Sequence, residues 1–289
     1  MPKSGTWYCR YFFHFLTHLL RGDASIPATL ENSMAAGPIP ELGLDCHGVF
    51  HSAFPEFDKY RGPYQASWQK LQYHLAGYDM ASPLMRQEPA RFLASHNPNA
   101  RFVYLVRNPL DQTVSFFHHG LKHTDPTALL KRNRDGEYAC NADGSLWKPA
   151  SPKEFLRHNL ESYLKQYLTW HLSADLFPKQ IKIVHYAELT RAPERTFSAI
   201  LKFLNCDCSQ PHFDQCFQQA IKLSSKNNIR SIEEKIGHAL GNDQQDRNER
   251  HVRDGRIGKW QEHFDDEDLR FLSAELAKWG LSPKHFTLH

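Results

Sequence analysis

The sequence predicts an α/β fold, with a central parallel β-sheet covered by helices on both faces. Two apolar runs, residues 101–106 and 181–186, have the length and composition of buried strands. Segments of helical periodicity alternate with these runs along the chain, as they do in parallel sheets. Because helices from both ends of the chain are needed to cover one sheet, we expect residues 1–289 to form a single domain.

The first predicted element is a buried helix from Tyr8 to Leu20. Its apolar residues recur at the spacing of a helix. The run contains Arg10, His14 and His18 and is too short to cross a bilayer, so we expect neither a membrane span nor a signal peptide. The apolar positions are Phe12, Phe13, Leu16, Leu19 and Leu20.

The rest of the chain alternates strands with helices. Asn108-Pro109 ends the 101–106 strand, and Asp111 opens a helix that runs to about His119. The other expected helices cover Pro152 to His171, Ala192 to Leu204 and Asp268 to Trp279, and the 181–186 strand lies between the first two.

Two polar stretches interrupt this alternation. Lys131 to Ala150 is polar and carries two glycines, so we expect a surface insertion. Glu233 to Lys259 has few apolar residues to bury, so we expect a mobile loop.

The charge balance and the cysteine spacing argue against some classes of function. The chain has 35 Lys and Arg against 32 Asp and Glu, and this balance argues against a protein that binds long nucleic acids. Its six cysteines are scattered in a chain too large to need a disulfide framework, and Cys206-x-Cys208 with Cys216 fits no zinc pattern well. We therefore expect reduced thiols in a cytoplasmic protein, with no metal ion.

The segment Pro2-Lys3-Ser4-Gly5-Thr6-Trp7 has the features of an anion-binding turn. Gly5 lets the backbone approach a ligand closely, and the N–H groups and dipole of the following helix favour an anion. Lys3 supplies a full positive charge, while Ser4 and Thr6 supply hydroxyl donors. The alternative is a lysine-bearing loop at a frayed terminus.

A second candidate site begins where the 101–106 strand ends. Arg107 follows the strand, and Ser115 lies eight residues later on the predicted helix. A strand–turn–helix unit can bring both groups to the C-terminal edge of the sheet, where open α/β sheets bind ligands. An arginine fork and a hydroxyl there suit a terminal phosphate. The alternative is that Arg107 pairs with Asp111 in a structural turn.

A third basic segment runs from Arg253 to Trp260. It holds three cations and two glycines, which suits a loop that closes over an anion. Taken alone this signal is weak, because basic surface loops are common.

Together the three segments resemble the sulfotransferases that use 3′-phosphoadenosine 5′-phosphosulfate (PAPS) as sulfate donor. Residues 2–6 look like that family's 5′-phosphosulfate loop, and Arg107-Asn-Pro-x-Asp-x-x-Val-Ser115 looks like its 3′-phosphate motif. Arg253-x-Gly255-x-x-Gly258-x-Trp260 looks like its C-terminal closing loop, and Tyr186-Ala-Glu-Leu resembles a segment whose tyrosine lies by the adenine. Order and spacing fit from Met1 to about Phe264.

The resemblance implies a three-layer sandwich like that of P-loop NTPases, and PAPS as co-substrate without a metal. It implies that Lys3 is catalytic and that the acceptor is a hydroxyl or amine of a small molecule or sugar. It also implies a general base near residues 74–79, for which we predict Asp79, with His74, His47 and His51 as alternatives. The implied donor-binding residues are Lys3, Ser4, Gly5, Thr6, Trp7, Arg107, Ser115, Tyr186, Arg253 and Gly255.

The chain departs from the family pattern at several positions. Trp7 stands where the family has a second threonine, Tyr8 where it has tryptophan, Asp254 where it has lysine, and Lys226 where an aromatic often covers the adenine. In the family's fold a central strand leads directly into the first loop, whereas this sequence starts at Met1. We therefore expect the slot beside the 101–106 strand to be empty or irregularly filled.

Two other functions remain open from the sequence. A P-loop kinase or nucleotidase would need glycine immediately before the lysine, where this chain has Pro2, and would leave Arg107 and Ser115 without a role. A non-catalytic relative that binds nucleotide is the second alternative. The acceptor depends on loops at 40–90 and 120–150, which match no known pattern, and the oligomeric state cannot be read from the sequence.

Overall fold

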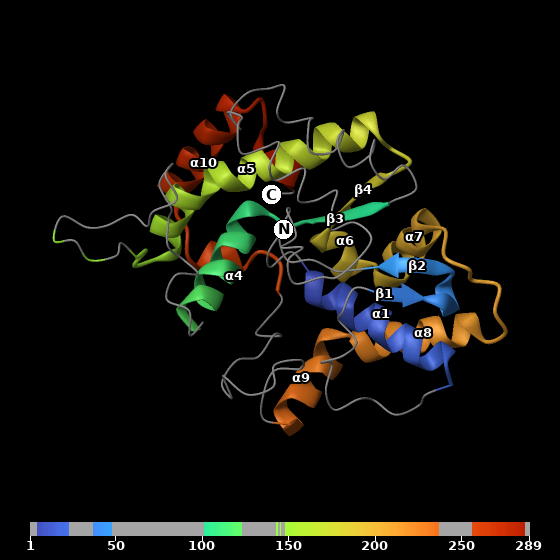
Figure 1. The fold of residues 1–289 in the computed structure, drawn as a ribbon. Helices are drawn as coiled ribbons and strands as arrows, with labels where there is room; N and C mark the ends of the chain where they lie inside the picture. Colours follow the sequence, from blue (N-terminus) through green and yellow to red (C-terminus); the bar gives the residue numbers. More distant parts are fainter. Residues whose placement is uncertain are drawn as a thin grey trace. The chain divides into compact units, whose positions relative to one another are not determined.

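The computed structural model of the chain describes residues 5–22, 37–47, 101–122, 143, 145, 148–236 and 256–286. The chain divides into two compact units, which are described separately. The first comprises residues 1–106 and 169–255, and the second comprises residues 107–168 and 256–289. Figure 1 shows the elements of both. The single domain expected from the sequence stays a prediction.

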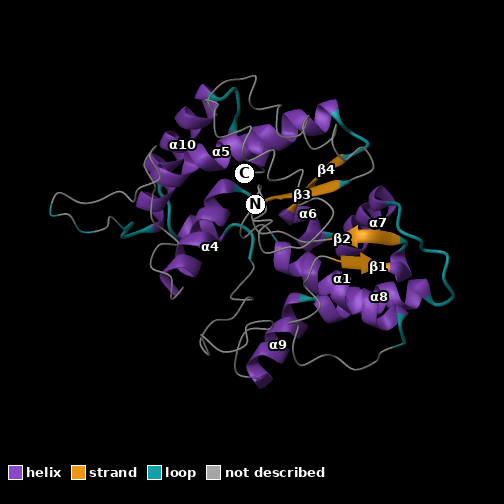
Figure 2. Ribbon diagram, in the orientation of Figure 1, coloured by secondary structure: helices purple, strands orange, loops and turns teal. Residues whose placement is uncertain are grey.

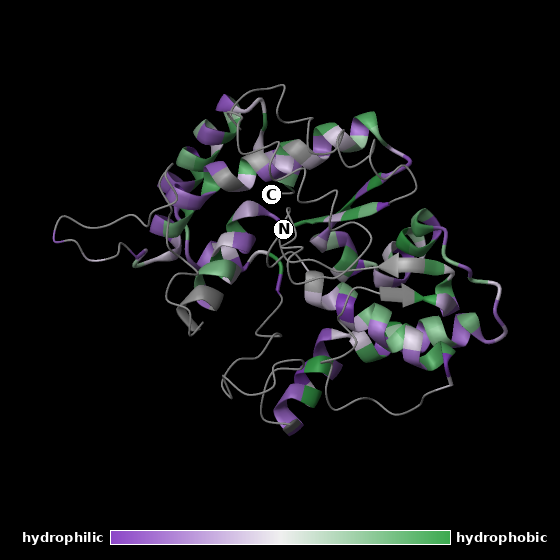
Figure 3. Ribbon diagram, in the orientation of Figure 1, coloured by the Kyte–Doolittle hydropathy of each residue, from purple (hydrophilic) through white to green (hydrophobic). Residues whose placement is uncertain are grey.

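The first unit contains the parallel sheet that the sequence predicts. Strands β3 (Phe102–Val106) and β4 (Ile181–His185) pair in parallel, with Phe102 opposite Ile181 and Val106 opposite His185 (Figure 2). Both strands lie within one residue of their predicted bounds. Figure 3 shows β3 coloured as mainly hydrophobic, which fits a strand buried in a parallel sheet.

Helices cover both faces of this strand pair. Successive side chains of a strand point to opposite faces. Leu105 belongs to a core formed with helices α1 (Thr6–Leu20), α7 (Pro193–Leu204) and α8 (Phe213–Ser224). Its neighbour Tyr104 stacks on Trp170, with 5.0 Å between ring centroids. Trp170 belongs to α5 (Pro152–Leu176), so the predicted three-layer arrangement is confirmed.

Helix α1 is the buried helix expected after the first loop. Phe12 is fully buried, stacks on Phe197 with ring centroids 3.8 Å apart, and meets Phe217 edge-on at 5.7 Å. The helix begins two residues earlier than predicted, at Thr6. At its C-terminal end, Arg21 donates two hydrogen bonds to the Glu41 carboxylate, at 2.6 and 3.1 Å.

Several elements of the first unit were not predicted. A hairpin of β1 (Gly37–Ile39), a 3₁₀ turn η1 (Pro40–Leu42) and β2 (Leu44–His47) precedes β3. Tyr186, predicted as the last strand residue, instead begins α6 (Tyr186–Arg191).

The prediction of a mobile loop from Glu233 was wrong at its start. Residues 233–236 belong to helix α9 (Lys226–Ile236), and Glu233 is fully buried. Ile229 is buried and Ile232 packs against the core, one turn apart on the same face. The sequence analysis missed this helix because its apolar stripe is narrow and the neighbouring residues in the sequence are polar. Residues 237–255 lie outside the described part of the chain.

The expected gap beside β3 stays a prediction. Within the described residues β3 pairs with β4, and residues 1–4 and 48–100 lie outside the description. The predicted surface insertion also lies largely outside it.

The second unit contains α4 (Pro109–Lys122), the first part of α5, and α10 (Asp266–Lys278). Among its described residues are the 3₁₀ turns η3 (Lys259–Glu262) and η4 (Pro283–Phe286). All three helices were predicted, although α5 continues to Leu176 rather than His171 and α4 to Lys122 rather than His119. None of the helices described is long and apolar enough to cross a bilayer.

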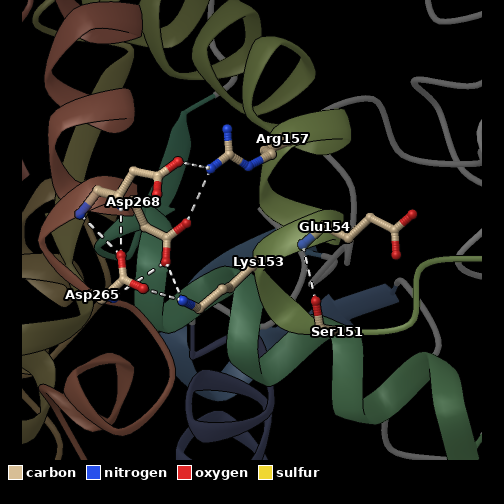
Figure 4. A network of polar contacts seen from close by, with 7 residues as sticks. Ser151, Lys153, Glu154, Arg157, Asp265 and Asp268 are labelled. Carbon is tan, nitrogen blue, oxygen red and sulfur yellow. Dashed lines mark hydrogen bonds and ion pairs between the residues drawn. The ribbon is translucent and has the colours of Figure 1, made fainter.

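A charged network joins the first turns of α5 and α10 (Figure 4). Asp265 and Asp268 form a capping box at the start of α10. Lys153 lies 2.5 Å from the Asp265 carboxylate and 2.9 Å from that of Asp268, and Arg157 lies 3.4 Å from Asp268. Asp268 is almost fully buried. The two cations and the N-terminus of α10 offset the cost of burying its negative charge.

Candidate active site

The start of α1 supplies the first part of the site. Gly5 is the N-cap residue, with φ 100° and ψ 11°, a left-handed conformation that glycine adopts readily. Its carbonyl accepts the hydrogen bond from Cys9 N at 3.2 Å, the first of the helix. The left-handed turn leads directly into the helix, whose first N–H groups have no acceptor within the helix itself. A helix start of this kind can bind an anion, and the anion-binding role of this turn stays a prediction.

Tyr186 closes one side of this turn. Its ring lies so close to Gly5 that a Cβ on residue 5 would come 2.8 Å from Tyr186 Cδ2. Tyr186 directly follows β4, so it lies at the C-terminal edge of the parallel strands, where open α/β sheets bind ligands. The structure therefore brings together two residues that the sequence analysis assigned to one nucleotide.

Tyr8 and Trp7 extend the same region along α1. Burial, reinforced by Cys9 and Tyr186, raises the pKa of Tyr8 to about 12. Its ring meets Phe197 edge-on at 5.3 Å. Trp7 is half-buried and carries the Arg10 guanidinium over its ring, 4.9 Å from the centroid.

His185 ends β4 immediately before Tyr186. Burial lowers the pKa of His185 below 6.5, and Glu188 opposes this effect in part. The imidazole ring lies 6.3 Å from that of His171, edge to face. A mainly neutral histidine therefore adjoins the predicted adenine tyrosine.

In the second unit, Arg107 begins the phosphate motif. Tyr163 donates a hydrogen bond from its hydroxyl to the Arg107 carbonyl at 2.5 Å, which fixes the backbone at this point. Asn108 caps α4 because its Oδ1 accepts from Leu110 N at 2.8 Å and more weakly from Asp111 N at 3.4 Å. Ser115 is half-buried on α4, one turn beyond Asp111 and on the same face.

The same motif is bonded to the beginning of η3. Arg107 Nη2 donates to the carbonyl of Arg256 at 3.3 Å. The Asp111 carboxylate accepts from Gly258 N at 2.9 Å and from Trp260 N at 3.2 Å. We call residues 256–262 the closing segment. Asp111 therefore binds backbone groups far along the chain. The alternative in which Arg107 and Asp111 pair in a local turn did not include these hydrogen bonds.

The remaining predicted site residues lie outside the side chains that the structure describes. Lys3, Ser4, Arg253 and Gly255 lie outside the described residues, as do Asp79, His74 and His51. Thr6 and His47 are described only in their backbone, in α1 and β2. Their roles stay predictions.

The next feature is the set of side chains that could bind a metal ion. No group of three or more His, Cys, Asp or Glu side chains in the described ranges could hold a metal ion. Cys9, Cys206, Cys208 and Cys216 are free thiols, and burial raises the pKa of Cys206 to about 12. The sequence prediction that the site uses no metal stays a prediction.

These features define an α/β fold with a glycine turn at the C-terminal edge of its parallel strands. The chain belongs to the sulfotransferase domain family, whose model matches residues 1–278. It is therefore a sulfotransferase, as the three motifs predicted.

Two solved structures support the same fold. Mouse sulfotransferase SULT7A1 complexed with PAP aligns with a TM-score of 0.53 and 14% identity, over 96% of this chain and 80% of that one. Retinol dehydratase in complex with androsterone and the inactive cofactor PAP aligns with a TM-score of 0.51 and 15% identity, over 96% of this chain and 77% of that one. A comparison with curated proteins gave no significant match.

Proposed function

We propose that this protein transfers a sulfuryl group from PAPS to a hydroxyl or amine of a small molecule or sugar. The observation that carries the donor assignment is the left-handed Gly5 turn beneath Tyr186, because it joins the predicted phosphosulfate loop to the predicted adenine residue. Family membership supports the reaction. PAP, the desulfated form of PAPS, is present in both solved structures named above, which supports the donor.

The chemistry follows from where charge develops. The acceptor oxygen or nitrogen attacks sulfur in line, and the bond from sulfur to the oxygen of the 5′-phosphate breaks. Negative charge then grows on that departing oxygen, and Lys3 with the N–H groups at the start of α1 would stabilise it. A sulfuryl group carries less charge than a phosphoryl group, so this step does not require the divalent ion that kinases use.

The 3′-phosphate would be held away from the reacting atoms. Arg107 and Ser115 from one motif and Arg253 with Gly255 from another would bind it by charge-assisted hydrogen bonds. Such contacts orient the donor and take no part in bond cleavage.

The acceptor proton needs a base. Asp79 is our first candidate, and His74, His47 and His51 are the alternatives. Substitution of each in turn, followed by pH–rate profiles, would assign the role, since loss of the base removes one limb of the profile.

The acceptor class and the location complete the proposal. Retinol dehydratase was solved with androsterone, so hydroxylated lipophilic molecules belong in the panel beside phenols, alcohols and sugars. A cytoplasmic location is expected from the scattered cysteines of the sequence, and the four described cysteine side chains are free thiols.

Transfer assays test the function directly. The protein is incubated with ³⁵S-labelled PAPS and each acceptor, and labelled product is separated from donor. Product with any acceptor supports the proposal. Binding of PAP without product from any acceptor would favour the non-catalytic alternative, and transfer from labelled ATP would favour the kinase alternative.

A further inference from the structure

We infer that Asp111 is a positioning residue for recognition of the 3′-phosphate. It anchors the closing segment to α4, and the Arg256 carbonyl of that segment accepts a hydrogen bond from Arg107, which we propose binds the phosphate. This inference rests on the proposed function, because it concerns the same donor.

The contacts of Asp111 make it an anchor. Its side chain is almost fully buried, and its two oxygens accept from different backbone N–H groups, those of Gly258 and Trp260. Gly258 is the N-cap of η3, so the carboxylate satisfies donors at the start of this turn that have no acceptor within it. Hydrogen bonds to a charged acceptor are worth more than neutral ones.

Two further contacts define the shape of the closing segment. The Arg256 carbonyl accepts from Arg107, and the Arg256 guanidinium lies 3.3 Å from the Glu262 carboxylate at the other end of the segment. The Trp260 side chain is buried. The segment is therefore held at its start, its middle and its end.

This anchoring also restrains the Arg107 side chain. The Arg256 carbonyl belongs to the segment that Asp111 holds, and it accepts a hydrogen bond from Arg107 Nη2 at 3.3 Å. The guanidinium of Arg107 is thereby oriented for the charge-assisted hydrogen bonds that a phosphate would accept. Loss of the Asp111 bonds would free the Arg256 carbonyl and weaken the hold of Arg107 on the 3′-phosphate.

The test compares two nucleotides that differ only in the 3′-phosphate. Calorimetry measures the Kd of PAP and of adenosine 5′-monophosphate (AMP) for wild type and for Asp111→Asn. The amide keeps the size of the carboxylate but directs an NH₂ group at one of the two N–H donors. We expect the variant to bind PAP about tenfold or more weakly and AMP nearly as well as wild type, since two charge-assisted bonds are affected.

Asp268→Asn is the matched control. Asp268 is an equally buried carboxylate of the same unit that accepts from a backbone N–H at the start of α10. Its substitution should lower the unfolding free energy without changing the ratio of the two Kd values. A general loss of stability is thereby separated from a loss of phosphate recognition.

A second pair of variants disturbs the closing segment without altering Asp111. Gly258 has φ 83° and Gly280, at the end of α10, has φ 69°, and a Cβ at either would meet no atom of the described residues within 4 Å. Both alanine variants therefore carry similar backbone strain. Gly258→Ala should reduce the preference for PAP, and Gly280→Ala should leave it unchanged.

The outcomes separate the inference from the function on which it rests. If wild type does not prefer PAP over AMP, the proposed donor itself is wrong. If wild type prefers PAP and both Asp111→Asn and Gly258→Ala keep that preference, the donor stands and the positioning role of Asp111 is refuted. If Asp111→Asn does not fold, the Gly258 and Gly280 pair decides alone.

Discussion

The ring of Tyr186 lies against Gly5, and the space between them is too small for a methyl group. A Cβ on residue 5 would come 2.8 Å from Cδ2 and 3.2 Å from Cε2 of the ring. The contact joins the turn before α1 to the residue that follows β4, two segments far apart in the sequence. It therefore sets the distance between the predicted phosphosulfate loop and the predicted adenine residue.

Gly5→Ala should weaken both stability and donor binding. The left-handed conformation costs a non-glycine residue about 1–2 kcal/mol, and the clash with Tyr186 adds to this. Gly22 is the control, because it lies just beyond the other end of α1 with φ 74°, and a Cβ there would meet no atom of the described part of the chain within 4 Å. Urea unfolding should show a larger loss for Gly5→Ala than for Gly22→Ala, and only Gly5→Ala should weaken PAP binding. Equal losses in both assays would argue against the contact.

A double-mutant cycle isolates the clash from the backbone strain. In a Tyr186→Ala background the Cβ at residue 5 no longer meets the ring, so Gly5→Ala should cost less unfolding free energy than it does in wild type. The difference should exceed about 0.5 kcal/mol, the lower end of coupling between residues in contact. Additive effects would show that the ring does not restrict residue 5.

Asn108→Ala should destabilise the protein by about 0.5–2 kcal/mol, the usual effect of removing an N-cap side chain. Its Oδ1 accepts from two N–H groups of the first turn of α4. Asn108→Ser can accept the same bonds and should recover most of the loss in urea unfolding. If serine and alanine are equally destabilising, the side chain has another role.

The stability of the protein should fall as the pH drops below about 7. The pKa of His185 in the folded chain lies below its ordinary value of 6.5 because the ring is buried. Below pH 6.5 His185 binds a proton more readily in the unfolded chain than in the folded chain, so protonation favours unfolding. His185→Gln should reduce the loss of unfolding free energy between pH 7.5 and 5.5. A pKa for His185 at or above 6.5 by NMR would contradict this account.

Local sequence signals predicted most of the fold, because a buried strand needs a continuous apolar run and an amphipathic helix needs a regular stripe. Residues 101–106 are such a run, and the observed strand differs by one residue. Helix α9 was missed because Ile229 and Ile232 are isolated among polar residues, and the buried Glu233 suggested exposure. The 37–47 hairpin was missed because its strands are short and its turn contains proline.

The sequence named individual residues of the candidate site, but it did not predict the contacts between the described ones. Gly5 follows from its place before an apolar helix, since a tight turn is needed there. Its contact with Tyr186 depends on how β4 lies beside the helix, which no local pattern encodes. Asp111 was expected to open a helix or to pair with Arg107 in a turn, whereas its carboxylate accepts from backbone N–H groups 147 and 149 residues away.

Calorimetry of PAP binding tests the central claim most directly. We predict that wild type binds PAP, and that Lys3→Ala and Arg107→Ala each weaken it about tenfold or more, because each removes a charged donor to a phosphate. Arg195→Ala removes an equal charge from an exposed position on α7 and should change little. No binding of PAP by the folded wild type, or unchanged affinity in both site variants, would contradict the account.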